Sequence, residues 1–99
     1  MALKLFISQP MSDKTDEEIK EERINALKEA KEVLGEDVEE IDTFFEGEGF
    51  KSPLEFLGKA ISTMAKADVV YFCKDWEKYR GCKIEHTCAI EYGKKVIEK

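Results

Sequence analysis

The sequence predicts an α/β fold in which a four-stranded parallel sheet lies between two layers of helices, a three-layer arrangement of the flavodoxin-like or Rossmann-like kind. Short apolar segments typical of strands alternate with segments of helical periodicity, in the order β-α-β-α-β-α-β. One of these segments, residues 69–73, is continuously apolar, as expected for a central parallel strand that is covered on both faces. The 99 residues suffice for one domain, so we expect a single domain over residues 1–99 with strand order 2-1-3-4.

The N-terminal part of the chain contains a strand followed by a long helix. Leu3–Ser8 is a short, largely apolar run that ends just before a proline, which lacks the amide hydrogen that a strand requires. Thr15 and Glu18 have the spacing of a capping box, in which each side chain accepts a hydrogen bond from the backbone amide of the other residue. Gly35 provides a helix stop. These residues predict a buried strand at Leu3–Ser8 and a helix at Asp16–Leu34.

The middle of the chain contains a weak strand, an aromatic loop and a second helix. Residues 37–42 include only two apolar side chains, which predicts a short strand near an edge of the sheet. Glycines indicate a loop at residues 43–51, which could close over a ligand. Ser52 starts a second capping box, and Pro53 follows it at the first helical position. The expected core-facing residues of this second helix are Leu54, Leu57, Ile61, Met64 and Ala65.

The C-terminal part of the chain completes the alternation and indicates where a ligand would bind. After the strand Val69–Cys73 come a loop at residues 74–81, a helix that Gly93 stops, and a short strand within residues 94–98. In open parallel sheets, ligands bind beyond the carboxyl ends of the strands. The loop at residues 8–14 and the loop at residues 74–81 both follow strands, so we expect the site to lie between them.

The composition argues against several classes of function. The net charge of −6 opposes binding to a nucleic acid polymer. No apolar run approaches the roughly 20 residues that cross a bilayer, and we expect no secretion signal. Three cysteines form no obvious disulfide framework, so we expect a reducing, cytoplasmic setting. Because about 100 residues bury limited surface alone, we also expect a homodimer or a higher homo-oligomer.

The segment Arg80–Gly93 (RGCKIEHTCAIEYG) carries the most informative carboxylate of the chain. Helical spacing places Glu85 at the edge of the buried side, among small residues and close to the strand ends. One interpretation is structural, because acidic residues are favoured in the first turn of a helix, at the positive end of its dipole. The other is a partly desolvated carboxylate that a ligand can reach, which suits a nucleophile. The residues alone leave both interpretations open.

Neighbours of Glu85 permit other chemistry as well. Cys82 and His86 are one helical turn apart and could bind zinc, but no fourth ligand is evident, so we expect no metal. The same pair could form a cysteine nucleophile and its base, in competition with Glu85. Trp76 could cover the core or stack on a nucleobase. The chain has no phosphate-binding glycine motif, which argues against an ATPase or a dinucleotide enzyme, and we expect no cofactor.

This last helix resembles the glutamate-bearing helix of the nucleoside 2-deoxyribosyltransferase superfamily. The shared pattern is a glycine, three residues, the nucleophilic glutamate, and an alanine four residues later, here Gly81, Glu85 and Ala89. The opening segment LKLFISQPM resembles the first strand and loop of the superfamily, and ADVVYFCKDWE resembles its third strand. Within the superfamily, the chain is most similar to a branch of short bacterial and phage proteins catalogued as a domain of unknown function.

The resemblance implies an N-glycosyl transferase or hydrolase that acts on nucleosides or nucleoside 5′-monophosphates through a covalent glycosyl-glutamate intermediate. By this match, Glu85 is the nucleophile, and Gly81 lets the sugar or a 5′-phosphate approach the helix. The residues expected to bind the substrate are Ser8, Gln9, Met11, Asp75, Trp76 and Gly81.

The sequence also departs from the superfamily pattern at two positions. The transferases commonly have an aspartate two residues before the glycine, where this chain has Tyr79, and another in the preceding helix, where it has Ala60. Asp75, Trp76 or Asp13 could replace one of them. These departures support an alternative function, a nucleotide-binding module of the same fold that has lost catalysis. A further alternative is an interaction domain that acts through oligomerisation.

Overall fold

The computed structural model describes residues 2–10, 14–41 and 52–99. These residues form one four-stranded parallel sheet in the order β2-β1-β3-β4, which confirms the predicted α/β fold and strand order. No helix within the described ranges is long and apolar enough to cross a membrane. The predicted aromatic loop at residues 43–51 lies outside the described residues. The elements are β1 (Leu3–Ser8), α1 (Asp16–Leu34), β2 (Val38–Glu40), α2 (Pro53–Met64), β3 (Val69–Phe72), η1 (Trp76–Lys78, a 3₁₀ helix), α3 (Arg80–Glu91) and β4 (Lys95–Glu98).

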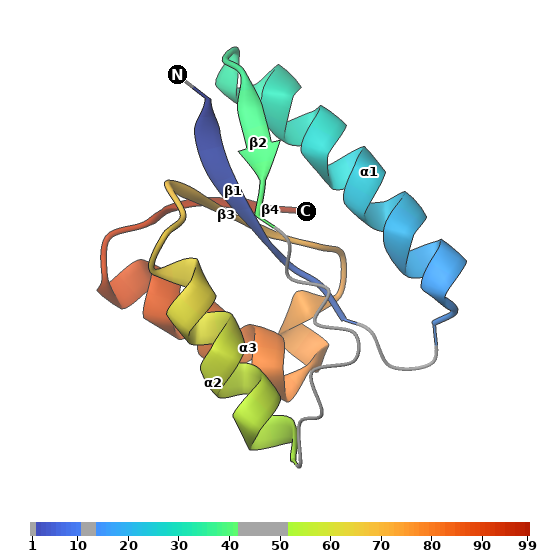
Figure 1. Cartoon of the computed structure of the whole chain (residues 1–99), viewed down its shortest axis with the longest axis vertical. Helices are drawn as coiled ribbons and strands as arrows, with labels where there is room; N and C mark the ends of the chain where they lie inside the picture. Colours follow the sequence, from blue (N-terminus) through green and yellow to red (C-terminus); the bar gives the residue numbers. More distant parts are fainter. Residues whose placement is uncertain (1, 11–13, 42–51) are drawn as a thin grey trace.

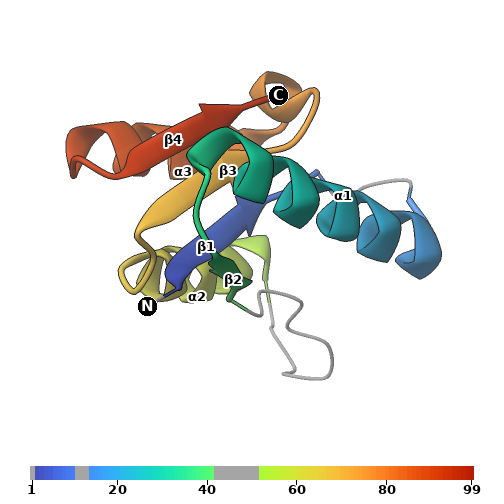
Figure 2. The ribbon, with the colours of Figure 1, turned by 90° about the horizontal axis from the view of Figure 1, so that it is seen from above.

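The sheet is covered by α1 on one face and by α2 and α3 on the other (Figure 1). Seen from above, α1 lies in front of the strands and the other two helices lie behind them (Figure 2). Successive strand side chains point to opposite faces, so β1 and β3 each supply both cores. The α1 face buries Leu5, Ile7, Val69, Tyr71 and Cys73 together with alanines of α1. The α2/α3 face buries Phe6, Val70 and Phe72 together with Ala60, Met64 and Ala89.

The register of the central strands brings their carboxyl ends to the same level. Ser8, the last residue of β1, pairs with Phe72, the last residue of β3. The amide of Cys73 donates to the carbonyl oxygen of Ser8 at 3.0 Å, which extends the pairing by one step. Because Ser8 is two residues after Phe6, its side chain points to the α2/α3 face. This places a hydroxyl group at the end of the sheet, directly opposite the helix that carries Glu85.

The first helix begins and ends where the sequence predicts. The side chain of Thr15 accepts from the amide of Glu18 at 3.1 Å, and the carboxylate of Glu18 accepts from the amide of Thr15 at 3.1 Å. Gly35 ends the helix in the left-handed conformation, with φ at 64°, which a side chain rarely adopts. The reciprocal cap fixes the direction in which the chain enters α1 after the loop that follows β1.

The Thr15 cap leads to a first prediction. Replacing Thr15 with alanine is expected to lower the free energy of unfolding by about 1 kcal/mol, because the amide of Glu18 loses its acceptor. Urea unfolding followed by circular dichroism measures this change. Thr87→Ala is the control, because Thr87 is an exposed threonine within α3 and alanine favours a helix interior. Equal losses in the two variants would contradict a capping role.

The predicted buried face of α2 is partly wrong. Ser52 caps this helix as expected, accepting from the amide of Glu55 at 3.2 Å. However, Leu54 is 75% exposed and Ala65 is exposed, whereas Ala60 and Met64 form the buried contact with the sheet. Ala60 and Met64 pack with Phe6 and Val70 of the sheet, so this side of α2 points inward. The face containing Leu54 then remains free to line a pocket.

Candidate functional site

Glu85 lies on the buried side of α3. It is 7% exposed, and it shares this side with Cys82 and Ala89, which are also buried. The helix begins at Arg80, so Glu85 stands in its second turn, and the first turn contains no acidic residue. An interaction with the positive end of the helix dipole falls off within the first turn. The structural interpretation of Glu85 as a first-turn carboxylate is therefore wrong, and its burial needs another reason.

Ser8 and Glu85 are brought together by the fold although 77 positions separate them. The Ser8 hydroxyl donates to Oε1 of Glu85, with 2.5 Å between the two oxygens. Ser8 is 1% exposed, so this hydrogen bond is shielded from water. Cys82 lies on the same buried side of α3, close enough to Ser8 for this hydroxyl to lower the pKa of the Cys82 thiol. Ser8, Cys82 and Glu85 thus form one buried polar cluster at the carboxyl end of β1.

Burial changes the protonation of this cluster. Desolvation raises the pKa of Glu85 from its ordinary value of 4.5 to about 7, although the hydrogen bond from Ser8 acts in the opposite direction. Desolvation likewise raises the pKa of the Cys82 thiol to about 11, so this thiol is neutral at physiological pH. Glu85 is therefore the only member of the cluster that changes its charge near neutral pH, as is common for groups that take part in catalysis.

The Ser8 hydrogen bond leads to a second prediction. Replacing Ser8 with alanine is expected to raise the pKa of Glu85 by about 1 pH unit, because the charged carboxylate loses its donor. A carbon-13 NMR titration of the Glu85 carboxyl group measures the pKa. Ser62→Ala is the matched control, because Ser62 is an exposed serine on α2, and it should leave the titration unchanged. A pKa that falls or stays constant in Ser8→Ala would contradict this account of the site.

A pocket of about 770 Å³ opens beside Glu85, between α2 and α3. This volume is within the range of sites that hold small molecules. The pocket has a polar side formed by Glu85 and Arg80 and an apolar side formed by α2 residues. The residues that line it are Gln9, Ser52, Pro53, Leu54, Phe56, Leu57, Arg80, Gly81, Cys82, Ile84 and Glu85. A ligand in this pocket would lie across the start of α3, with Glu85 in its wall.

Gly81 lines the pocket at the start of α3. A Cβ atom built at this position would meet no atom within 4 Å, so the packing of the chain does not itself require glycine here. The cap residue Tyr79 provides no side-chain hydrogen bond to the helix end. The backbone at the start of α3 is thus open toward the pocket.

Gln9 also borders the pocket, but its amide group is engaged on the other side of the sheet. Nε2 donates to the carbonyl oxygen of Ile19 at 2.9 Å and to Glu22 at 2.8 Å. Oε1 accepts from Arg23 at 3.3 Å. These bonds tie the end of β1 to α1, so the Gln9 side chain holds these two elements together.

Asp75 and Trp76 are not among the residues that line the pocket in the described part of the chain. Asp75 has φ at 69° and forms an ion pair with Lys78 at 3.3 Å. The ring of Trp76 stacks on His86 with 4.1 Å between centroids and also lies against Phe72. This arrangement corresponds to the interpretation of Trp76 as a cover for the core. Met11, the remaining predicted site residue, lies outside the described residues.

His86 is directed away from Glu85. Its ring lies between Trp76 and the edge of Phe72, and Nε2 is 3.3 Å from a carboxylate oxygen of Glu98 on β4. The adjacent position on a helix is rotated by about 100°, which separates the two side chains. A Cys82–His86 pair therefore has no support in the geometry, since Cys82 turns toward Ser8 and His86 toward β4.

A partly buried ion pair that was not predicted from the sequence supports the site. Arg23 is 5% exposed on α1, and its guanidinium binds Glu40 of β2 at 2.7 Å. The same guanidinium donates to Gln9. Helical spacing could have predicted the burial of Arg23, because it lies four residues after Ile19 and three before Ala26, on the predicted core face.

Comparisons with known proteins identify one family. The family model described as "Domain of unknown function (DUF4406)" matches residues 3–98, which is nearly the whole chain. No curated protein and no solved structure matches the chain.

Proposed function

The chain belongs to the DUF4406 family, and we propose that it is an N-glycosyl transferase or hydrolase acting on nucleosides or nucleoside 5′-monophosphates. We further propose that the family is a branch of the nucleoside 2-deoxyribosyltransferase superfamily. The observation that carries both proposals is the buried Glu85 carboxylate, which Ser8 holds in the wall of a pocket at the carboxyl end of β1. Burying a carboxylate costs free energy. Buried carboxylates with a raised pKa are common at functional sites.

The proposed reaction has two steps, both at Glu85. An oxygen of the carboxylate attacks the anomeric carbon of the sugar while the bond to the base breaks, and the base leaves with the electron pair and gains a proton from water. A glycosyl ester of Glu85 results. Water or a second base then attacks the same carbon and releases a proton to the solvent, the ester bond breaks, and the carboxylate is restored. The chain of events is that of a retaining glycosidase.

The surroundings of Glu85 support this chemistry. Ser8 bonds to Oε1 of Glu85, and no hydrogen bond from the described residues goes to Oε2, which leaves Oε2 for the attack. The half-buried side chains of Phe56 and Leu57 supply apolar surface against which a base can lie. Arg80 and the open backbone at Gly81 are suited to the sugar or its 5′-phosphate. The pocket thus offers a separate surface for each part of a nucleotide.

A second candidate is a nucleotide-binding module without catalysis. The raised pKa of Glu85 favours it, because a carboxyl group that is partly protonated near neutral pH can donate a hydrogen bond to a ligand. The two missing aspartates, at the positions of Tyr79 and Ala60, point the same way. In this candidate, Ser8 and Glu85 recognise the ligand and break no bond.

Chromatography of released bases distinguishes the two candidates. Purified protein is incubated with ribo- and deoxyribonucleosides and their 5′-monophosphates, with and without a second free base. Release without exchange identifies a hydrolase, and exchange with the added base identifies a transferase. No release from any compound, together with a ligand-induced rise in melting temperature, would leave only the binding module.

A further inference from the structure

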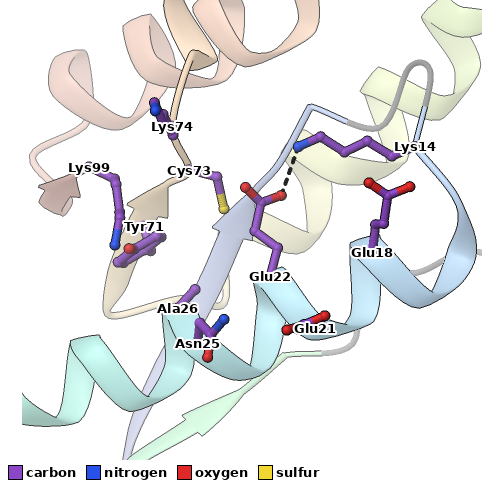
Figure 3. A pocket seen from close by; sticks show the side chains of 10 residues that line it. All are labelled: Lys14, Glu18, Glu21, Glu22, Asn25, Ala26, Tyr71, Cys73, Lys74 and Lys99. Carbon is purple, nitrogen blue, oxygen red and sulfur yellow. Dashed lines mark hydrogen bonds and ion pairs between the residues drawn. The ribbon is translucent and has the colours of Figure 1, made fainter.

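A second pocket, of about 400 Å³, lies on the opposite face of the sheet from Glu85 (Figure 3). It is enclosed by α1 on one side and by the carboxyl ends of β3 and β4 on the other. The sheet separates it from the Glu85 pocket, because Tyr71 and Cys73 point to the α1 face whereas Phe72 points to the α2/α3 face. The proposed glycosyl chemistry makes no use of this second pocket.

The floor of this α1-face pocket is uncharged. It is formed by Ala26 of α1 and by the side chains of Tyr71 and Cys73. Desolvation raises the pKa of the Cys73 thiol to about 12, and it raises the pKa of the Tyr71 hydroxyl as well. Both groups therefore keep their protons at physiological pH. Any charge that a ligand meets in this pocket must come from the walls.

The walls carry both signs of charge, and only the strand-end lysines, Lys74 and Lys99, stand across from the carboxylates of α1. Lys74 and Lys99 stand at the ends of β3 and β4, and Lys14 stands near the start of α1 (Figure 3). Three carboxylates project from α1, those of Glu18, Glu21 and Glu22. The lining thus contains three ammonium groups and three carboxylates, in a protein whose net charge is −6. An anion alone would face the carboxylates of α1, and a cation alone would face the lysines.

Part of this charge is not neutralised within the chain. Oε1 of Glu22 accepts hydrogen bonds from Gln9 and Lys14, whereas Oε2 lies on the side of Cys73 (Figure 3). Lys14 pairs with Glu22 at 3.0 Å, and Lys99 pairs with Glu29 at 3.1 Å outside the pocket. Within residues 2–10, 14–41 and 52–99, Lys74 and Glu21 have no ion-pair partner.

We propose that the α1-face pocket binds a small zwitterion of the free α-amino acid class. The carboxylate of the ligand lies toward Lys74 and Lys99, and its ammonium group lies toward Glu21 and Glu22. The side chain of the ligand rests on the uncharged floor. Such a ligand pairs with both walls, whereas a singly charged ligand of the same size pairs with one wall and is repelled by the other. This site is independent of the proposed function at Glu85.

Backbone NMR of the full chain tests the proposal. Glycine, L-serine and L-glutamine are titrated separately to millimolar concentration, with acetate and methylammonium as singly charged probes. At least one amino acid is expected to shift the amide signals of residues 21–26 and 71–74, and acetate and methylammonium are expected to bind at least about 5-fold more weakly. Lys74→Ala and Glu21→Gln should each weaken binding of the amino acid by about 5-fold or more.

Two control variants separate a local effect from a change of net charge. Lys95→Ala and Glu32→Gln remove exposed charges on β4 and on α1 away from the lining residues, and they should leave the affinity unchanged. Melting temperatures check that all four variants fold. The proposal is overturned if no amino acid shifts these signals, if acetate binds as tightly as the amino acids, or if the two lining variants bind as the wild type does. None of these results bears on base release at Glu85.

Discussion

Replacing Glu85 with glutamine is expected to lower the rate of base release by about 10³-fold or more, because an amide cannot form the glycosyl ester. Glutamine has the shape of glutamate, and its carbonyl oxygen can still accept the Ser8 hydrogen bond, so substrate affinity should change little. The wild-type rate should rise with pH through about 7, since only the ionised carboxylate attacks. Chromatographic initial rates and a nucleotide-binding titration of each variant measure these effects.

The matched control for this loss is Glu91→Gln. Glu91 is an exposed glutamate near the end of α3, so the control changes the net charge equally without touching the pocket. It should retain the wild-type rate. If Glu85→Gln also retained it, the nucleophile assignment would be lost. A rate that falls with rising pH would instead assign Glu85 as a general acid, which uses the protonated form.

The same substitution is expected to change how stability depends on pH. The folded-state pKa of Glu85 is raised to about 7, whereas the unfolded chain has the ordinary value of 4.5. Between pH 4.5 and about 7, Glu85 is ionised in the unfolded chain but still protonated in the folded protein. The free energy of unfolding therefore falls as the pH rises through this range. Raising a pKa from 4.5 to about 7 corresponds to a loss of about 3 kcal/mol.

Urea unfolding at a series of pH values measures this effect. Relative to Glu85→Gln, the wild type should lose about 3 kcal/mol between about pH 4 and about pH 8. Any constant cost of the buried amide cancels in this difference. Glu91→Gln should follow the wild-type curve in shape. Parallel curves for the wild type and Glu85→Gln would mean that the carboxylate is not desolvated in solution. The expected result is a residue that costs stability at the pH at which it acts, as found at many active sites.

Much of the fold could be predicted because its signals are local. The cap at Thr15, the stop at Gly35 and the apolar run at residues 69–73 each depend on a few adjacent residues. Alternation of such segments then limits the topology to a parallel sheet. The face of α2 that meets the sheet could not be predicted from adjacent residues in this way. Five candidate residues for its core stripe fit helical spacing, and only contact with the sheet selects Ala60 and Met64 over Leu54.

The candidate site likewise has features that the sequence predicts and features that only the packing decides. Glu85 could be identified from Arg80–Gly93 because its spacing from Gly81 and Ala89 is contained in one helix. Its bond to Ser8 could not be derived, because the two residues meet only through the register of β1 on β3 and the packing of α3. For Trp76, the sequence allowed a role that the position of its ring does not favour. A tryptophan in a loop beside the strand ends fits a stacking role, but the turn of η1 carries its ring onto His86.

By itself, the sequence determined the order of the elements, the caps of the first two helices and the helix that carries Glu85, because propensity, capping and periodicity act over a few residues. Only the tertiary structure decided that Glu85 is buried against Ser8 with a pKa near 7, and that Arg23 can be buried beside Glu40. These properties depend on desolvation and on charges from distant segments, which exist only once the strands and helices have packed.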